Sequence, residues 1–239
     1  MGQSDTVDRI LDAAEQLFAE RGFSETSLRM ITSKAGVNLA AVNYHFGSKN
    51  DLIQAVFARF LSPFSKIIDQ ELDKRMVEGE ISLGVEELLI IITSSIVRIS
   101  SRSKNGLPVF MRLLGLAYTQ SQGHLRKYLE AEYKHSFRRF MKVFKEATPE
   151  LTNIDRFWRI QFTMGAMAFT MSSSHALTDI LQSDLGVKTS TSDIVARLVP
   201  FVSAGMKAPP ADTEQLLASF HTDAVDPDTF VQVTSGPVK

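Results

Sequence analysis

The stretch TSLRMITSKAGVNLAAVNYHFGSK, residues 26–49, decides the fold of the N-terminal part of the chain. A hydroxyl side chain at Thr26 or Ser27 can cap a helix that Gly36 ends, because glycine adopts the left-handed backbone common at helix C-termini. After this turn, Asn38 can cap a short second helix over residues 39–45. Two helices separated by such a turn form a helix-turn-helix, which places its second helix in the DNA major groove. The stretch therefore predicts DNA binding.

Further helices are predicted on both sides of this stretch. The preceding segment has apolar residues at helical spacing, begins near residues 4–5 and stops at Gly22. Behind the stretch, Ser48 can cap a longer helix whose apolar pattern continues past Pro63 to Leu72. Proline can kink a helix, and a helix of this length would join the N-terminal domain rigidly to the following one.

The charges of the chain are segregated. The formal net charge is -1, so the total charge does not indicate a nucleic-acid partner. Between residues 26 and 49, however, the cations Arg29, Lys34 and Lys49 occur without any Asp or Glu. The acidic residues of the first helix can therefore lie on a face turned away from DNA.

The rest of the chain has the pattern of a helical domain. Strand alternation is absent, and beyond residue 207 the sequence is polar and contains proline, which predicts a mostly flexible tail with at most one docked turn around Leu216, Leu217 and Phe220. The predicted fold is all-α, with a helix-turn-helix domain over residues 1–50, a larger helical ligand-binding and dimerisation domain over 51–207, and the tail over 208–239. In the larger domain we expect helices at about 85–99, 108–119, 123–147, 153–181 and 191–206.

Several classes of protein are excluded or disfavoured. The absence of cysteine excludes disulfides, thiolate catalysis and cysteine-ligated metal sites. The N-terminus lacks a signal peptide, and no apolar run approaches the roughly 20 residues that span a bilayer, so we expect a cytoplasmic protein without a membrane partner. No G-x-S-x-G, phosphate-loop or H-E-x-x-H motif is present. We therefore expect that the protein is not an enzyme and has neither catalytic residues nor a cofactor. A metal site is also not expected, because His45 has no second ligand at helical spacing.

Several spaced positions together carry a family resemblance. Thr26, Ile31, Ala35-Gly36-Val37, Tyr44-His45-Phe46 and Lys49 resemble the N-terminal DNA-binding domain of the TetR family of bacterial regulators. The all-helical remainder, with its two long late helices, is similar to the ligand-binding and dimerisation domain of that family. The resemblance implies a homodimer, with a palindromic double-stranded DNA operator as its partner.

The resemblance also implies roles for individual residues. Asn43 would hydrogen-bond to a base, and Ala40 and Ala41 would touch thymine methyl groups. Leu39 departs from the polar residue often found at its position. The residues near the groove floor would be Asn38, Leu39, Ala40, Ala41 and Asn43, and the DNA-binding set is completed by Thr26 and Arg29 with the phosphate contacts Ser27, Tyr44, His45 and Lys49. An isolated Tyr-His-Phe could be explained by packing alone. The residues expected in the core of this domain are Ile31, Ala35, Val37, Val42 and Phe46.

Two segments, 108–129 and 157–177, are rich in phenylalanine, methionine and small residues. These side chains can line a long apolar cavity or simply fill a helical core. Arg112 lies between apolar flanks, so if it points inward it needs an anion such as a ligand carboxylate, and otherwise it forms an internal salt bridge or faces solvent. His175 can contact a ligand at the pocket mouth or face a dimer partner. The candidate ligand-binding residues are Phe110, Met111, Arg112, Leu114, Phe162, Met167, Met171 and His175, with Met164 and Phe169 beside them.

The whole segment from residue 4 to residue 206 looks like the PsrA-type branch of the TetR family, on motifs such as ILDAAEQLFAERGF and FMRLLGLAYTQSQGHLRKYLE. That branch responds to long-chain fatty acids. The resemblance implies a repressor of fatty-acid metabolism genes that a long-chain fatty acid or acyl-CoA releases from its operator. The alternatives are a TetR-like regulator of another hydrophobic ligand, such as a drug efflux repressor, and an acyl-binding helical protein that does not bind DNA.

The late helices suggest how a dimer would form. Small residues lie beside large ones on the segments 153–181 and 191–206, which allows close helix packing across a two-fold axis. Burial within one subunit is the alternative. The small residues are Gly165, Ala166, Ala168, Ala176, Ala196, Ala204 and Gly205.

Overall fold

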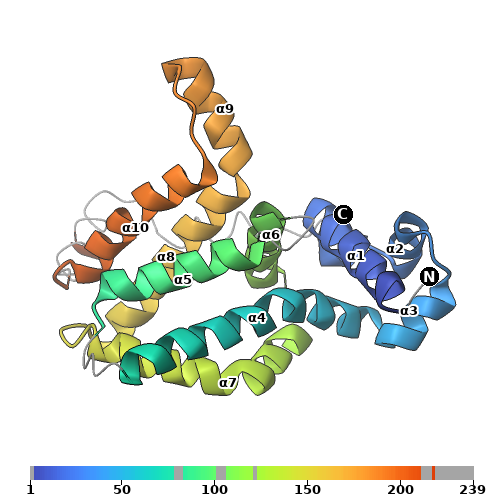
Figure 1. The fold of residues 1–239 in the computed structure, drawn as a ribbon, viewed down its shortest axis with the longest axis horizontal. Coiled ribbons are helices and arrows are strands. Elements are labelled where there is room, and N and C mark those ends of the chain that lie inside the picture. The colour runs from blue at the N-terminus through green and yellow to red at the C-terminus, as the bar shows by residue number, and fades with distance from the viewer. Residues whose placement is uncertain (1–2, 78–82, 101–105, 121–122, 211–216, 219–239) are drawn as a thin grey trace. The chain divides into compact units, whose positions relative to one another are not determined.

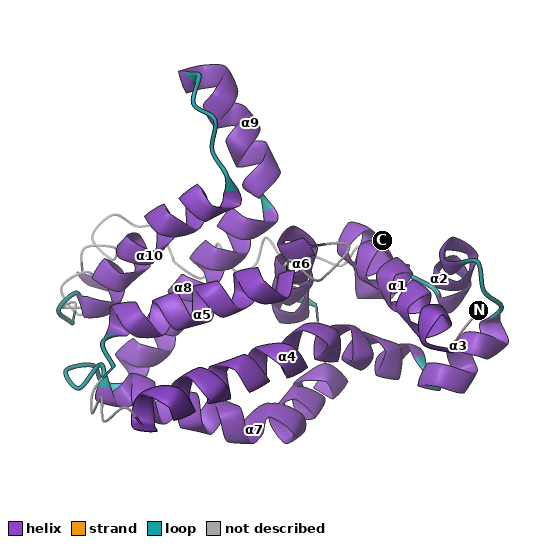
Figure 2. Cartoon of the chain, in the orientation of Figure 1, coloured by secondary structure: helices purple, strands orange, loops and turns teal. Residues whose placement is uncertain are grey.

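The computed structural model describes residues 3–77, 83–100, 106–120, 123–210 and 217–218. Every regular element in these ranges is a helix, which confirms the all-α prediction (Figures 1 and 2). The helices are α1 (Gln3–Glu25), α2 (Leu28–Ala35), α3 (Leu39–Phe46), α4 (Lys49–Val77), α5 (Val85–Ser100), α6 (Gly106–Thr119), α7 (Gly123–Glu146), α8 (Asn153–Ser172), α9 (Ser174–Leu185) and α10 (Thr191–Lys207). Among the described residues, no helix combines the length and apolar character that crossing a membrane requires.

The first three helices pack with the start of α4 around one aromatic core. The rings of Phe18 and Phe23 lie 5.4 Å apart, and Phe57 of α4 lies 6.2 Å from Phe23. Ile31 of α2 and Val42 of α3 are fully buried in the same cluster. The apolar residues at helical spacing in the sequence therefore form the core that orients α2 and α3.

The predicted caps are present at the expected residues. Ser27 accepts a hydrogen bond from the backbone N–H of Met30 at 3.3 Å, and Asn38 accepts one from Ala41 at 2.8 Å. Ser48 likewise accepts one from the backbone N–H of Asp51. Gly36 ends α2 with a φ of 64°, in the left-handed region that a side chain would strain. These contacts fix both ends of the helix-turn-helix.

Helix α4 joins the helix-turn-helix to the larger helical part. It continues through Pro63, which cannot donate the helical hydrogen bond to the carbonyl oxygen of Arg59. Before the proline, α4 packs against α1, and Phe60 stacks on Phe110 of α6 with ring centroids 4.3 Å apart. After it, α4 packs beside α7 and α5 (Figure 1). The connector predicted from the sequence is therefore a single helix with contacts to both parts.

In the larger part, α5 packs on α10 and α6 packs on α8. The prediction of one helix over residues 153–181 is wrong, because α8 ends at Ser172 and α9 begins at Ser174. Ser173 leaves the helical path with φ -100° and ψ 10°, and its N–H bonds to the carbonyl oxygen of Phe169. The Ser172 hydroxyl donates to the same carbonyl, a local bond by which serine competes with the helix ladder.

The chain divides into two compact units, Met1–Lys207 and Ala208–Lys239. In the second unit the structure describes residues 208–210 and 217–218. The predicted flexibility of the tail, and most of the docked turn expected around residues 216–220, concern residues outside the described ranges.

Candidate nucleic-acid interface

One face of α3 is anchored and the opposite face is open. Val42 is fully buried and holds α3 against the core. Leu39, Ala40, Asn43 and Tyr44 are exposed, and the Tyr44 side chain is 77% accessible. Ala41 is half-buried beside them. The structure therefore presents, on one side of a short capped helix, the residues that we expected near a groove floor.

Ser27 and Arg29 lie at the start of α2, and both are exposed. Ser27 caps the start of α2 and Asn38 caps the start of α3, each with a side-chain oxygen. Both residues therefore hold a helix end in place at the surface. Exposed backbone N–H groups at such helix starts can bind anions. The two helix starts thus frame the exposed face of α3.

Lys49 lies at the first residue of α4. It is half-buried, and its ammonium group donates a hydrogen bond to the carbonyl oxygen of Ser24 at 3.4 Å. The His45 ring is also half-buried and lies edge-on to Tyr44, with ring centroids 5.0 Å apart. Lys49 therefore carries its positive charge close to the turn between α1 and α2.

The predicted DNA contact of Thr26 is wrong. The residue is fully buried, and its hydroxyl lies 2.8 Å from the carbonyl oxygen of Gly22 and 3.1 Å from that of Leu17. Both oxygens belong to the end of α1, where Gly22 breaks the helix with a φ of 83°. Thr26 therefore ties the break in α1 to the start of α2.

Arg9 was not among the residues predicted for this site. Its guanidinium reaches from α1 and donates hydrogen bonds to the carbonyl oxygens of Ala35 and Gly36, the latter at 2.9 Å. A cation is favourable at these oxygens because they lie at the negative end of the α2 dipole. No local pattern in the sequence indicates this contact, because Arg9 and Ala35 are 26 positions apart in the sequence.

Three acidic residues of α1 lie close to a cation of α4. Arg59 of α4 lies 2.6 Å from Asp12, 2.9 Å from the fully buried Glu15 and 3.7 Å from Asp8. Burial acts to lower the pKa of Arg59, but hydrogen bonds and the negative charges of Asp12 and Glu15 outweigh it and raise the pKa above its ordinary value. These three carboxylates share the positive charge of Arg59, and the sequence from Ser27 to Lys49 contains no carboxylate.

A small apolar pocket lies between α5, α6, α8 and α10. Its volume is about 10 Å³, on the scale of a single water molecule. Of the candidate ligand-binding residues, Met167 and Met171 line this pocket. The other lining residues were not predicted, since they are dispersed over three further helices: Thr93, Ile96, Val97, Leu107, Val195 and Leu198.

The other candidate ligand-binding residues lie elsewhere. Phe110 and Met111 are buried, and Phe110 packs on Phe60 of α4. Arg112 and His175 are exposed, which contradicts the inward position that a ligand contact for Arg112 requires. Its neighbours Met111 and Leu113 take the buried face of α6, and i+1 positions on a helix point in different directions. Leu114 and Met164 are half-buried, whereas Phe162 and Phe169 are exposed on α8.

Two family models match the chain. The model described as bacterial regulatory proteins of the tetR family matches residues 10–56, and the model described as the tetracyclin repressor-like C-terminal domain matches residues 91–205. Together these ranges cover more than half of the chain. The chain belongs to the TetR family.

Curated TetR-type relatives match over a limited part of their length. The HTH-type transcriptional repressor Rv3405c of Mycobacterium tuberculosis is 35% identical over 77 residues, which are 32% of this chain and 41% of the relative. The HTH-type transcriptional repressor BepR of Brucella suis biovar 1 is 39% identical over 67 residues, which are 28% of this chain and 32% of the relative. The chain thus spans between about a third and two fifths of these relatives.

A solved structure shows the same fold over most of the chain. The crystal structure of a mutant HlyIIR protein aligns with a TM-score of 0.54 at 18% identity, covering 84% of this chain and 96% of that chain. The two matched TetR ranges also contain both sites. Residues 10–56 include α2, α3 and the start of α4, and residues 91–205 include all the pocket-lining residues.

Proposed function

We propose that this TetR-family chain is a homodimeric transcriptional repressor that binds a palindromic DNA operator through α3 and is released by a long-chain fatty acid or acyl-CoA. The observation that carries DNA binding is the open face of α3, framed by two capped helix starts, in a sequence from Ser27 to Lys49 without a carboxylate. Such a surface approaches phosphates without like-charge repulsion.

Within this surface, we assign two kinds of contact. Ser27, Arg29, Tyr44, His45 and Lys49 would contact the phosphate backbone and orient the domain. The exposed residues of α3 would meet the bases, with Asn43 as the hydrogen-bonding side chain and Leu39, Ala40 and Ala41 as apolar contacts to thymine. Asn38 would hold the start of α3 at the groove. Thr26 has no part in this set, because its side chain is buried.

A homodimer is supported by an apolar stripe on α8. Ile154, Trp158, Phe162 and Phe169 recur at intervals close to one or two helical turns and are all more than half exposed, with the exposed Gly165 in the same row. Helix α10 packs beside α8 and exposes Phe201. An exposed aromatic surface of this extent marks an interaction site, and an isologous pairing would bury both copies at once.

For the effector, we propose an apolar acyl chain that enters between α5, α6, α8 and α10. The described pocket is lined by aliphatic and methionine side chains with one hydroxyl, that of Thr93, and methionine adapts its shape to flexible ligands. A volume near that of one water molecule leaves no room for an acyl chain. Binding must therefore part these helices.

Parting the helices would act on DNA binding through α6. Leu107 of α6 lines the pocket, and Phe110, one turn later, stacks on Phe60 of α4. Displacement of α6 would thus move the connector to the helix-turn-helix. Effector and operator are then negatively linked, provided that the effector binds the released conformation a few kcal/mol more tightly.

The test of DNA binding is selection from a random library of duplexes with the full chain. We expect an enriched palindrome whose half-sites lie about one DNA turn, or a multiple of it, apart. Enrichment of no duplex over the starting library would refute the proposal.

The test of the effector is release of the selected duplex by saturated fatty acids of increasing length and by their CoA thioesters, measured as fluorescence anisotropy. We expect release to increase with chain length, because each buried CH₂ adds about 0.8 kcal/mol. Release by none of these compounds would leave DNA binding in place and overturn the acyl effector.

A further inference from the structure

The connector α4 is held by polar contacts on both sides of Pro63. Before the proline, Arg59 binds the carboxylates of α1. From Ser62 onward, a row of polar side chains on α4 meets a second row on α7. We call this second set the polar seam: Ser62, Ser65, Asp69 and Asp73 of α4 with Tyr133, Ser136 and Arg139 of α7.

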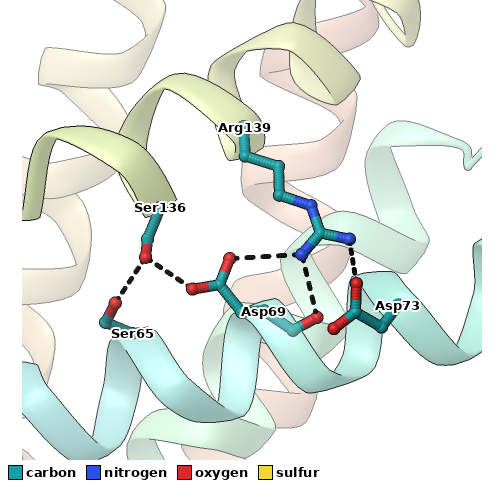
Figure 3. Close-up of polar contacts among 5 residues, drawn as sticks. All are labelled: Ser65, Asp69, Asp73, Ser136 and Arg139. Carbon is teal, nitrogen blue, oxygen red and sulfur yellow. Dashed lines mark hydrogen bonds and ion pairs between the residues drawn. The ribbon is translucent and has the colours of Figure 1, made fainter.

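Five residues of the polar seam form one connected network (Figure 3). The Ser65 hydroxyl donates to the Ser136 hydroxyl at 2.7 Å, and the Ser136 hydroxyl donates to the Asp69 carboxylate at 2.5 Å. Arg139 lies 3.5 Å from the other Asp69 carboxylate oxygen, donates to the Asp69 backbone carbonyl at 3.4 Å, and bonds to Asp73. One turn earlier, the hydroxyls of Ser62 and Tyr133 lie 2.8 Å apart.

The pairs also define direction and register. Residue numbers rise together from Ser62–Tyr133 through Ser65–Ser136 to Asp73–Arg139, so α4 and α7 run in the same direction. Apolar helix surfaces tolerate small sliding motions, whereas hydrogen bonds depend steeply on distance and angle. A shift of α4 by one turn would separate every one of these pairs. The seam therefore selects one register of α4.

The seam and the small pocket between α5, α6, α8 and α10 belong to one and the same conformation, in which that pocket has a volume of about 10 Å³. Under the proposed function, that conformation binds the operator. The stack of Phe110 on Phe60 lies three residues before Pro63, next to the start of the seam. Pressure from α6 would therefore reach α4 where the seam begins.

We infer that the polar seam positions the connector for operator binding, with Ser136 and Arg139 as its positioning residues. The inference rests on the proposed function. Neither residue touches DNA in this assignment, and both act through the placement of α4. Breaking the seam lowers operator affinity without changing the DNA-contacting surface.

A double cysteine variant, compared in its oxidised and reduced forms, gives the most direct test, because the natural chain contains no cysteine. The hydroxyl oxygens of Ser65 and Ser136 lie 2.7 Å apart, so the side chains at the two positions face each other, and cysteines there are placed to form a disulfide. In Ser65→Cys/Ser136→Cys, oxidation forms a disulfide that fixes the register of α4 against α7. The reduced variant has neither the disulfide nor the hydrogen bonds of the two serine hydroxyls. The probe is the duplex that the wild-type chain selects from a random library, and the readout is its dissociation constant by anisotropy.

We expect the oxidised variant to bind the duplex as the wild type does, and the reduced variant to bind it about five- to 150-fold more weakly, the range of typical coupling between sites. Arg139→Ala should show a similar loss. The matched control is Arg138→Ala, which removes the exposed cation next in sequence and should bind like the wild type. Dithiothreitol should leave wild-type binding unchanged, and circular dichroism confirms folding of each variant at the assay temperature.

Equal binding by the oxidised and reduced forms, or weaker binding by the oxidised form, overturns the inference. If Arg139→Ala does not fold, the cysteine pair still decides. A wild-type chain that binds no duplex refutes the proposed function, and the inference falls with it. Binding by the wild type with no effect of either seam variant refutes the seam alone.

Discussion

Lys49 combines a side-chain charge with a helix N-terminus. Because it would contact a phosphate, Lys49→Ala should weaken binding to every duplex to a similar degree. One phosphate contact fewer should also lower the magnitude of the slope of log K against log salt concentration by about one unit. Anisotropy titrations at several salt concentrations measure both quantities. An unchanged slope would remove Lys49 from the phosphate contacts.

Asn43 carries the side-chain amide on the open face of α3. If it reads a base, Asn43→Ala should cost about 1–3 kcal/mol on the selected duplex and much less on a scrambled one. Competition titrations with both duplexes give the ratio of the two dissociation constants. A parallel loss on the two duplexes would instead assign Asn43 to the backbone.

The helix caps were predictable from single residues, whereas the position of Thr26 was not. Ser27 and Asn38 each accept a hydrogen bond from the backbone N–H three residues later, so the local sequence contains the whole interaction. The Thr26 hydroxyl acts instead on Leu17 and Gly22, which come close only because α1 breaks and turns. Arg112 is a similar case, since flanking apolar residues do not tell which way one helical position faces.

Among the helices, Arg59 links α4 to the carboxylates of α1. Glu15 is fully buried and lies 2.9 Å from Arg59, so Arg59→Ala would remove a positive charge from beside a buried carboxylate. We expect the free energy of unfolding to fall by about 3–5 kcal/mol, measured by urea denaturation.

The control for this prediction is the double variant Arg59→Ala/Glu15→Gln, which also removes the buried negative charge. It should recover part of the loss, because a neutral amide costs less to bury than a carboxylate that has lost a neighbouring cation. Equal instability of the single and double variants would show that the packing of the Arg59 side chain, and not its charge, dominates.

The sequence predicted which segments are helical, but it did not predict which helices pack against each other. Apolar spacing predicted every helical segment, but one continuous pattern covered both α8 and α9 and hid the break at Ser173. The pocket was predicted only in its α8 wall, because Met167 and Met171 are one turn apart in the sequence. Its other walls come from α5, α6 and α10, and periodicity says nothing of which helices meet.

For the whole molecule, the α8 stripe should control assembly. Phe162→Asp places a charge in the centre of the stripe and should raise the dissociation constant of the dimer at least about thirtyfold, the equivalent of about 2 kcal/mol. Light scattering after size exclusion measures the mass over a dilution series. The matched control is Phe137→Asp on α7, because Phe137 is 64% exposed and Phe162 is 66% exposed. A wild-type chain that is monomeric at micromolar concentration would contradict the assignment.

The length of α4 before Pro63 would amplify a small tilt at the proline. Lys49 precedes it by 14 residues, so the first part of α4 is a lever arm of roughly 21 Å at 1.5 Å per residue. A tilt of about 5° at the proline would swing the far end by roughly 2 Å, and two subunits swinging in opposite senses would change the spacing of their α3 helices by roughly 4 Å. Hydrogen bonds to bases do not survive such an error. A tilt of a few degrees at Pro63 would therefore be enough to disengage a DNA half-site.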